Sequence, residues 1–288
     1  MNTPQLKSVQ CLSPAGLHYM AYREWGDPHN PKVLVCVHGL TRVSNDFDAL
    51  ARSLCDTYRV VCPDVVGRGR SDWLKNPNFY TVPQYVADMV TLLARLNAET
   101  VDWFGTSMGG LIGMGLASLP DSPVRKLLLN DVGAVLNTTA LTRIGEYVGR
   151  PVRFATFDEA MQYVIAISIT FGQHSDEEWR KFAEDVLRQD KEGQWILHYD
   201  PDLSVPFKAT TPESAQRDAA VLQATYDALR CETLLVRGAE SDLLSRDVAH
   251  DMTQRGPKAK LVELLGVGHA PTFVHDDQIA IAREFFLG

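Results

Sequence analysis

Short apolar runs alternate with amphipathic segments along most of this chain, and that alternation limits the folds it can adopt. The run 33–37 is apolar at every position, as in a parallel strand buried on both faces. A helical pattern follows, with Phe47, Leu50 and Leu54 on one face, and a second strand-like run occupies 58–62. Strands that alternate with helices form a mostly parallel sheet covered on both faces. The sequence therefore predicts an α/β fold with such a central sheet.

The alternation extends to both ends of the chain. Thr81 is a plausible cap for a helix with Pro83 in its first turn. The other strand-like segments lie at 7–12, 17–25, 126–129, 233–237 and 260–265.

Between about Leu136 and Ala209 the alternation breaks, and helical patterns follow one another without a convincing strand. We expect an inserted helical cap at 136–209 and a core made of 1–135 and 210–288. Several large side chains of the cap are candidates for the roof of a pocket, although such residues more often pack helices together: Phe154, Phe157, Met161, Tyr163, Phe171, Trp179 and Trp195.

The segment 103–110 reads as a strand that delivers a serine into a tight turn opening a helix. Gly105, Ser107 and Gly109 form a G-x-S-x-G motif, in which the glycines remove Cβ atoms that would collide with neighbouring backbone. The hydroxyl is left exposed at the end of the sheet. Ser107 is thereby predicted to be a nucleophile.

A serine hydroxyl needs a base, and the base needs an orienting acid. His269 follows the last strand-like run, and Asp242 follows the one before it. The ends of parallel strands meet at one edge of a sheet, where ligands bind. Residues far apart in the sequence are therefore expected to converge on Ser107.

A further loop, at His38-Gly39-Leu40, follows the strand at 33–37. The backbone N–H groups of Leu40 and Met108 are candidate donors to the oxyanion of a tetrahedral intermediate. His38 is expected to orient this loop rather than to take part in catalysis.

The order Ser107, Asp242, His269, together with the His-Gly loop and the turn at 64–72, resembles the α/β-hydrolase superfamily, in its capped serine-hydrolase branch. The resemblance covers nearly the whole chain and implies the roles of nucleophile, acid and base for those residues. It also implies that no cofactor is needed.

The position of the acid stays open. Family members often carry it three residues after the glycine that ends the strand, but Asp242 lies four after Gly238, and Ser241 takes the third place. Another variant of the family places the acid after the strand that follows the nucleophile, where Asp131 stands. Asp242 is preferred, Asp131 is the alternative, and Glu240 is a third candidate.

The resemblance favours hydrolysis of carboxylic esters with small or medium acyl groups through an acyl-enzyme. Three alternatives are open. Perhydrolase activity, as in the cofactor-free haloperoxidases of this family, would use the same triad. Carbon–carbon bond hydrolases of ring-cleavage products commonly carry Asn before the nucleophile and Trp after the histidine, where this chain has Thr106 and Ala270. A small-molecule sensor built on a hydrolase fold would retain the same residues, since fold alone does not settle function.

Charged residues give fewer leads. Arg42 follows the His-Gly loop and is a candidate to bind a substrate carboxylate, although an exposed arginine is the commoner outcome. No spacing of histidines with carboxylates or cysteines indicates a metal site. The expected partner is a small-molecule ester.

The net charge of −8 and the scattered basic residues argue against nucleic acid or an anionic membrane as a partner. No apolar run approaches the roughly 20 residues that span a bilayer, and the start lacks the pattern of a secretory signal. The five cysteines show no paired spacing. We therefore expect free thiols and a cytoplasmic protein.

Overall fold

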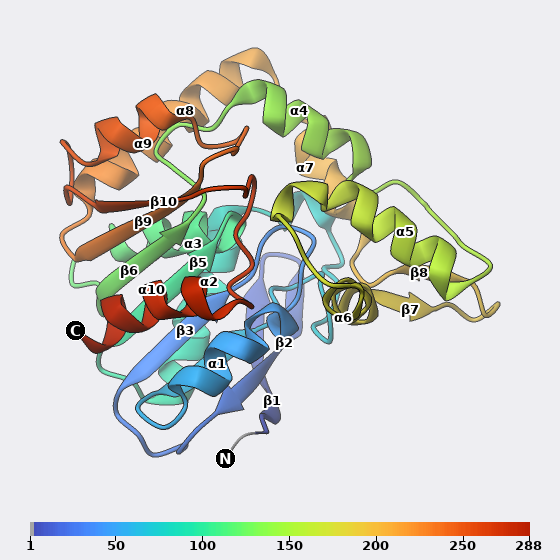
Figure 1. Cartoon of the computed structure of the whole chain (residues 1–288), viewed down its shortest axis with the longest axis horizontal. Coiled ribbons are helices and arrows are strands. Elements are labelled where there is room, and N and C mark those ends of the chain that lie inside the picture. Colours follow the sequence, from blue (N-terminus) through green and yellow to red (C-terminus); the bar gives the residue numbers. More distant parts are fainter. Residues whose placement is uncertain (1–2) are drawn as a thin grey trace.

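The computed structural model describes residues 3–288, which are built around an eight-stranded sheet (Figure 1). Its strand order is β1-β2-β4-β3-β5-β6-β9-β10. β2 pairs antiparallel with β1 and β4, and every pairing from β4 to β10 is parallel. The predicted mostly parallel sheet is confirmed. The strands are β1 (Gln5–Ser13), β2 (Gly16–Trp25), β3 (Val33–Val37), β4 (Arg59–Pro63), β5 (Val101–Thr106), β6 (Val124–Asn130), β9 (Glu232–Gly238) and β10 (Lys260–Leu264).

Helices cover both faces of this sheet, and alternate residues of each central strand feed two apolar clusters. In β3, Val35 belongs to the cluster beneath α2 and α3, and Leu34 to the cluster beneath α1 and α10. Both side chains are completely buried. This is why the run at 33–37 is apolar throughout. The helices of the core are α1 (Asp48–Leu54), α2 (Val82–Leu96), α3 (Met108–Ala117), α8 (Pro212–Ala228), α9 (Arg246–Met252) and α10 (Asp276–Leu287).

Between β6 and α8 the chain leaves the sheet and forms the lobe at the right of Figure 1. The lobe holds the helices predicted there and one short antiparallel hairpin that the sequence pattern did not predict. An isolated bridge between Arg68 and Tyr199 joins it to the core. Its elements are α4 (Thr138–Tyr147), α5 (Phe157–Ile167), α6 (Asp176–Val186), β7 (Leu187–Gln189), β8 (Trp195–Leu197) and α7 (Ser204–Lys208).

Short 3₁₀ turns connect several of these elements: η1 (Ser44–Phe47), η2 (Pro77–Phe79), η3 (Ile169–Phe171) and η4 (Pro201–Leu203). Side-chain caps start α5 and α6, where Thr156 and Ser175 form capping boxes with Glu159 and Glu178. Thr81 precedes α2 as predicted, but its side chain makes no cap hydrogen bond.

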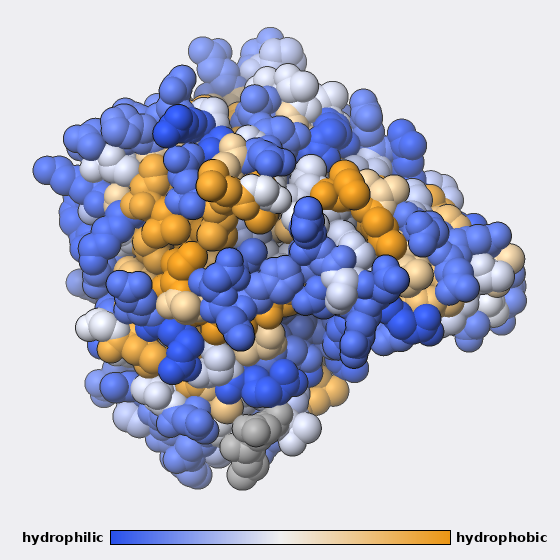
Figure 2. All heavy atoms as spheres, viewed as in Figure 1, coloured by the Kyte–Doolittle hydropathy of each residue, from blue (hydrophilic) through white to orange (hydrophobic). Residues whose placement is uncertain are grey.

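The surface seen in Figure 2 is mostly hydrophilic, with apolar side chains gathered over β10 and α10 and again over α5. Within residues 3–288, no helix has the length and apolar character that a membrane crossing requires.

Candidate active site

Ser107 lies at the sharp turn between β5 and α3, with backbone angles φ 50° and ψ −113° that few non-glycine residues adopt. The two motif glycines make this turn possible. A Cβ atom at position 105 would lie 2.3 Å from the carbonyl oxygen of Gly109, and one at position 109 would lie 2.0 Å from that of Val37. The predicted reason for both glycines is confirmed.

His269 reaches Ser107 from the loop after β10. Its Nε2 lies 3.0 Å from Ser107 Oγ. The loop is tied to η3, because Gly268 N–H donates to the Thr170 carbonyl oxygen over 2.8 Å and Thr170 Oγ1 donates to the carbonyl oxygen of His269. Asn130 Nδ2 donates to Pro271 O over 2.8 Å. The position of the imidazole thus depends on both the core and the lobe.

The carboxylate that meets this imidazole belongs to Asp131, just after β6. Asp131 Oδ2 lies 2.7 Å from His269 Nδ1. The same carboxylate is fully buried and accepts hydrogen bonds from Ser241 Oγ over 2.6 Å and from Gly238 N–H over 2.8 Å. Three donors therefore hold a charge that is closed off from solvent.

The expectation that Asp242 lies against His269 is wrong. The loop after β9 turns Ser241 inward to Asp131, so the next side chain points outward, where Asp242 is 45% exposed and pairs with Arg143 at 2.8 Å. Glu240 is exposed as well. The third place after Gly238 is thus filled by a hydroxyl that supports the alternative acid, Asp131.

His38 holds the loop that runs beside Ser107. Its Nε2 accepts a hydrogen bond from Val65 N–H over 2.9 Å, so Nδ1 carries the proton and donates to Gly39 O over 2.7 Å. Burial lowers the pKa of His38 to about 4, which keeps the ring neutral. A buried ring with both nitrogens used in this way fits the expected orienting role.

The two candidate oxyanion donors come from the ends of this loop and of the serine turn. Leu40 N–H has no hydrogen-bond acceptor within residues 3–288, and Arg68 Nε fixes the loop by donating to Leu40 O over 2.8 Å. Met108 is the first residue of α3, and N–H groups in the first turn have no acceptor inside their helix.

A cavity opens over Ser107 between the strand ends and the lobe. Ser107 and His269 lie on its floor side, and α4 to α6 supply much of its apolar wall. Apart from the residues of the loops around Ser107, its lining includes Arg143, Ile144, Tyr147, Val164, Ile167, Ser168, Phe171, Phe182, Val186, Leu197 and Tyr199.

Most of the side chains named as candidates for a pocket roof lie outside the cavity lining. Of the seven named from the sequence, Phe171 is found in the lining. Phe154 packs against Tyr163 with ring centroids 5.3 Å apart, and Phe157 meets Trp195 edge to face at 5.1 Å. These two pairs pack elements of the lobe against one another, which is the commoner role expected from the sequence.

Arg42 lines the cavity but is not the exposed arginine that the sequence suggested as the commoner outcome. It is 8% exposed and makes two hydrogen bonds to Asp46, of 2.9 and 2.7 Å. Its guanidinium also lies over the rings of Phe171 and Phe182. Burial opposes the charge, but Asp46 outweighs it, and the pKa of Arg42 is raised.

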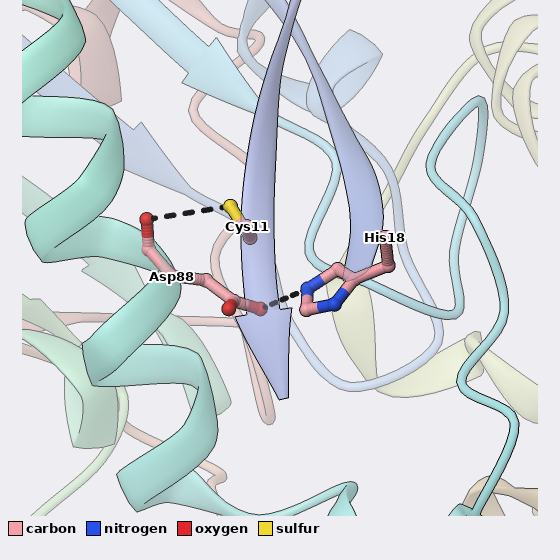
Figure 3. Close-up of side chains that lie close together, drawn as sticks. All are labelled: Cys11, His18 and Asp88. Carbon is pink, nitrogen blue, oxygen red and sulfur yellow. Dashed lines mark hydrogen bonds and ion pairs between the residues drawn. The ribbon is translucent and has the colours of Figure 1, made fainter. Parts of the chain in front are cut away.

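Away from the cavity, β1, β2 and α2 bring Cys11, His18 and Asp88 together in the interior (Figure 3). His18 Nε2 lies 3.0 Å from Asp88 Oδ2, and the Cys11 thiol faces the backbone oxygen of Asp88. Burial, followed by the charge of Asp88, raises the pKa of Cys11 to about 12. Spacing along the sequence did not predict this cluster, because its members come from three separate elements.

Comparison with known proteins extends the likeness over the whole chain. Residues 34–283 match the family model described as the alpha/beta hydrolase family. A 3-hydroxybutyrate-oligomer hydrolase of Cupriavidus necator is 60% identical over 289 residues, 99% of either chain. Esterase YbfF of Escherichia coli is 23% identical over 84% of this chain and 87% of its own. The crystal structure of an alpha/beta hydrolase from Novosphingobium aromaticivorans superposes with a TM-score of 0.84 at 32% identity, covering 100% of this chain and 99% of that one.

Proposed function

This chain belongs to the alpha/beta hydrolase family and is an enzyme that hydrolyses ester bonds, and from that premise we propose that it is a serine hydrolase. Ser107 is the nucleophile, His269 the base and Asp131 the acid. The observation that carries the proposal is the pair of contacts on one imidazole, 3.0 Å to Ser107 Oγ and 2.7 Å to Asp131 Oδ2.

In the first half of the reaction, Ser107 Oγ attacks the ester carbonyl while His269 Nε2 takes the hydroxyl proton. The carbonyl oxygen becomes an oxyanion, which the Leu40 and Met108 N–H groups stabilise. The bond between carbonyl carbon and alcohol oxygen then breaks, and His269 returns the proton to the departing alcohol. An acyl group stays on Ser107.

The second half repeats these steps with water. His269 takes a proton from the water as its oxygen attacks the acyl carbon, and the bond to Ser107 Oγ breaks as that oxygen recovers a proton. Asp131 orients the imidazole and stabilises its charged form in both halves. The Ser241 hydroxyl and Gly238 N–H hold the Asp131 carboxylate in place.

We further propose that the substrates are short oligomers of 3-hydroxybutyrate. The support is the 60% identity to a hydrolase named for that substrate, over 99% of both chains. Such an oligomer is a linear ester with small, largely apolar acyl units, and much of the cavity wall supplied by α4 to α6 is apolar.

The test is turnover of the 3-hydroxybutyrate dimer and trimer, and of p-nitrophenyl esters from acetate to decanoate, by the unchanged protein and by Ser107→Ala. We expect sustained release of 3-hydroxybutyrate and a fall of at least about 10⁴-fold in kcat for the variant. Ser118→Ala, a serine at the far end of α3, is the matched control and should keep full activity.

The other outcomes separate the competing functions. Turnover of p-nitrophenyl esters without turnover of the oligomers would retain the serine mechanism and reject the substrate. No turnover of any ester would reject both, and a vinylogous 1,5-diketone would then test carbon–carbon bond cleavage. Binding of ligands without turnover would identify a sensor.

A further inference from the structure

The cavity over Ser107 has two arginines in its lining, Arg42 and Arg143. Resting on the proposed function, the substrate is an ester whose alcohol portion ends in a carboxylate. A carboxylate entering an apolar cavity needs a cation, since an unpaired charge is costly to desolvate. The question is which guanidinium is free to receive it.

Arg42 is already committed. Its guanidinium binds Asp46 through Nε and Nη2, and the rings of Phe171 and Phe182 lie against it. To turn to a substrate, Arg42 would have to leave Asp46, whose side chain is 20% exposed, without its counter-charge. Because the Arg42 side chain is nearly buried, breaking this pair is unfavourable.

Arg143 is held far more loosely. Its Nε and Nη2 both approach one oxygen of Asp242, at 3.0 and 2.8 Å, and no acceptor within residues 3–288 binds its Nη1. The two side chains are 41% and 45% exposed. An ion pair this exposed to solvent contributes little to stability, so an incoming carboxylate can compete with Asp242.

The position of Arg143 also suits this role. It lies on α4, whose residues Ile144 and Tyr147 line the same cavity. A guanidinium can bind a carboxylate through two parallel hydrogen bonds, which fixes direction as well as charge. A carboxylate held there would present the ester on its other side to the interior of the cavity.

We propose that Arg143 is the subsite for the carboxylate on the alcohol portion of the substrate, with Asp242 occupying the guanidinium in the free enzyme. The enzyme then selects acid-terminated hydroxyacid esters over neutral esters of the same shape. Asp242, which lies against Arg143 rather than beside His269, is the partner that the substrate carboxylate replaces.

The experiment compares two substrates that differ in one group: the 3-hydroxybutyrate dimer as the free acid and as its terminal primary amide. The readout is the ratio of kcat/KM for acid over amide, from chromatography of the released products. Arg143→Gln should lower this ratio by about ten- to hundredfold, the scale of one charge-assisted contact. Arg143→Lys keeps the charge but loses the two parallel hydrogen bonds of a guanidinium, so it should give an intermediate ratio.

The control is Arg153→Gln, which removes the same charge from an exposed arginine of the lobe that pairs with Glu192 outside the cavity lining. It should leave the ratio as in the unchanged protein. An Arg143→Gln ratio equal to that of the control would overturn the carboxylate subsite while the serine mechanism stands. Failure of the unchanged protein to cleave either substrate would instead reject the proposed oligomer substrate, on which this inference rests.

Discussion

Two residues of the site hold backbone conformations that side chains usually avoid: Ser107 has φ 50° and Asp131 has φ 54°. Aspartate tolerates this region better than most residues, because its short side chain bonds locally. Ser107 is held there by its neighbours, since its N–H donates to Asn130 O over 2.9 Å. Both side chains are thereby aimed at His269 before any substrate arrives.

Replacing Asp131 by Asn should lower kcat by about 10³–10⁴-fold, because an amide at this place favours the wrong tautomer of the imidazole and cannot stabilise its charged form. The fold should persist, since Asn has nearly the same shape. Steady-state turnover of the 3-hydroxybutyrate dimer measures the effect.

Glu240→Gln is the control for Asp131→Asn, as it removes an exposed carboxylate from the loop that also carries Ser241. Its turnover should match that of the unchanged protein. Near-normal turnover in Asp131→Asn would contradict the assignment of the acid.

At this scale the sequence predicted the contact of Ser107 with His269, but it preferred Asp242 as the acid where the structure has Asp131. Ser107 and His269 each stand in a motif with its own glycines, whereas acids follow two neighbouring strands. Ser241 and Asp242 are adjacent in the chain and point in opposite directions. The turn of that loop is set by Asp131 itself, a contact across 110 residues that spacing does not reveal.

The element that decides the geometry is the unit β5, turn and α3. Gly109 packs α3 against β3 at backbone distance, and Trp103 Nε1 donates to Gly109 O over 3.0 Å, tying strand to helix. The hydroxyl of Ser107 can stand at the end of the sheet only if these two elements approach so closely.

Gly109→Ala should therefore destabilise the protein by about 1–3 kcal/mol and reduce turnover of the remaining folded enzyme, because a Cβ there meets the Val37 carbonyl at 2.0 Å. Urea unfolding and turnover of p-nitrophenyl butyrate measure the two effects.

Gly145→Ala tests the opposite case in α4, where nothing lies within 4 Å of an added Cβ. It should stabilise the protein by about 0.5–1 kcal/mol through helix propensity. Equal effects of the two changes would refute close packing as the reason for Gly109.

The bounds of the core strands were predictable to within a residue or two. A short run that is apolar at nearly every position fits a strand buried on both faces of the sheet. The hairpin of β7 and β8 was not. Each of its strands has three residues, too few for an alternation to be read. Its partner Phe154 and the contact of Arg68 with Tyr199 are long-range bridges that no local pattern carries.

For the molecule as a whole, burial of neutral histidine links stability to pH. The folded pKa of His38 is about 4, below its ordinary value of 6.5, because burial disfavours the charged ring. As the pH falls below 6.5, His38 becomes protonated in the unfolded chain but stays neutral in the folded protein. The stability contributed by a neutral His38 is thus complete above 6.5 and lost as the pH falls toward 4.

The free energy of unfolding should fall by up to about 3 kcal/mol on this account between pH 6.5 and pH 4, the product of the shift and the energy of one pKa unit. Urea titrations across that range, on the unchanged protein and on His38→Gln, measure it. The variant should begin less stable and lose less on acidification; parallel losses in both proteins would exclude His38 as the source.

The acid that we propose stands at the end of β6, which leaves Glu240 and Asp242, the carboxylates of the loop after β9, outside the proposed catalytic group. In that loop Ser241 donates a hydrogen bond to Asp131, and Asp242 pairs with Arg143. The residues proposed for bond cleavage and the residue proposed to select the alcohol portion are therefore different, although Ser241 and Asp242, which contact them, are adjacent in the chain. Exchange of Arg143 can therefore change which esters are preferred, while the contacts of His269 with Ser107 and Asp131 are kept.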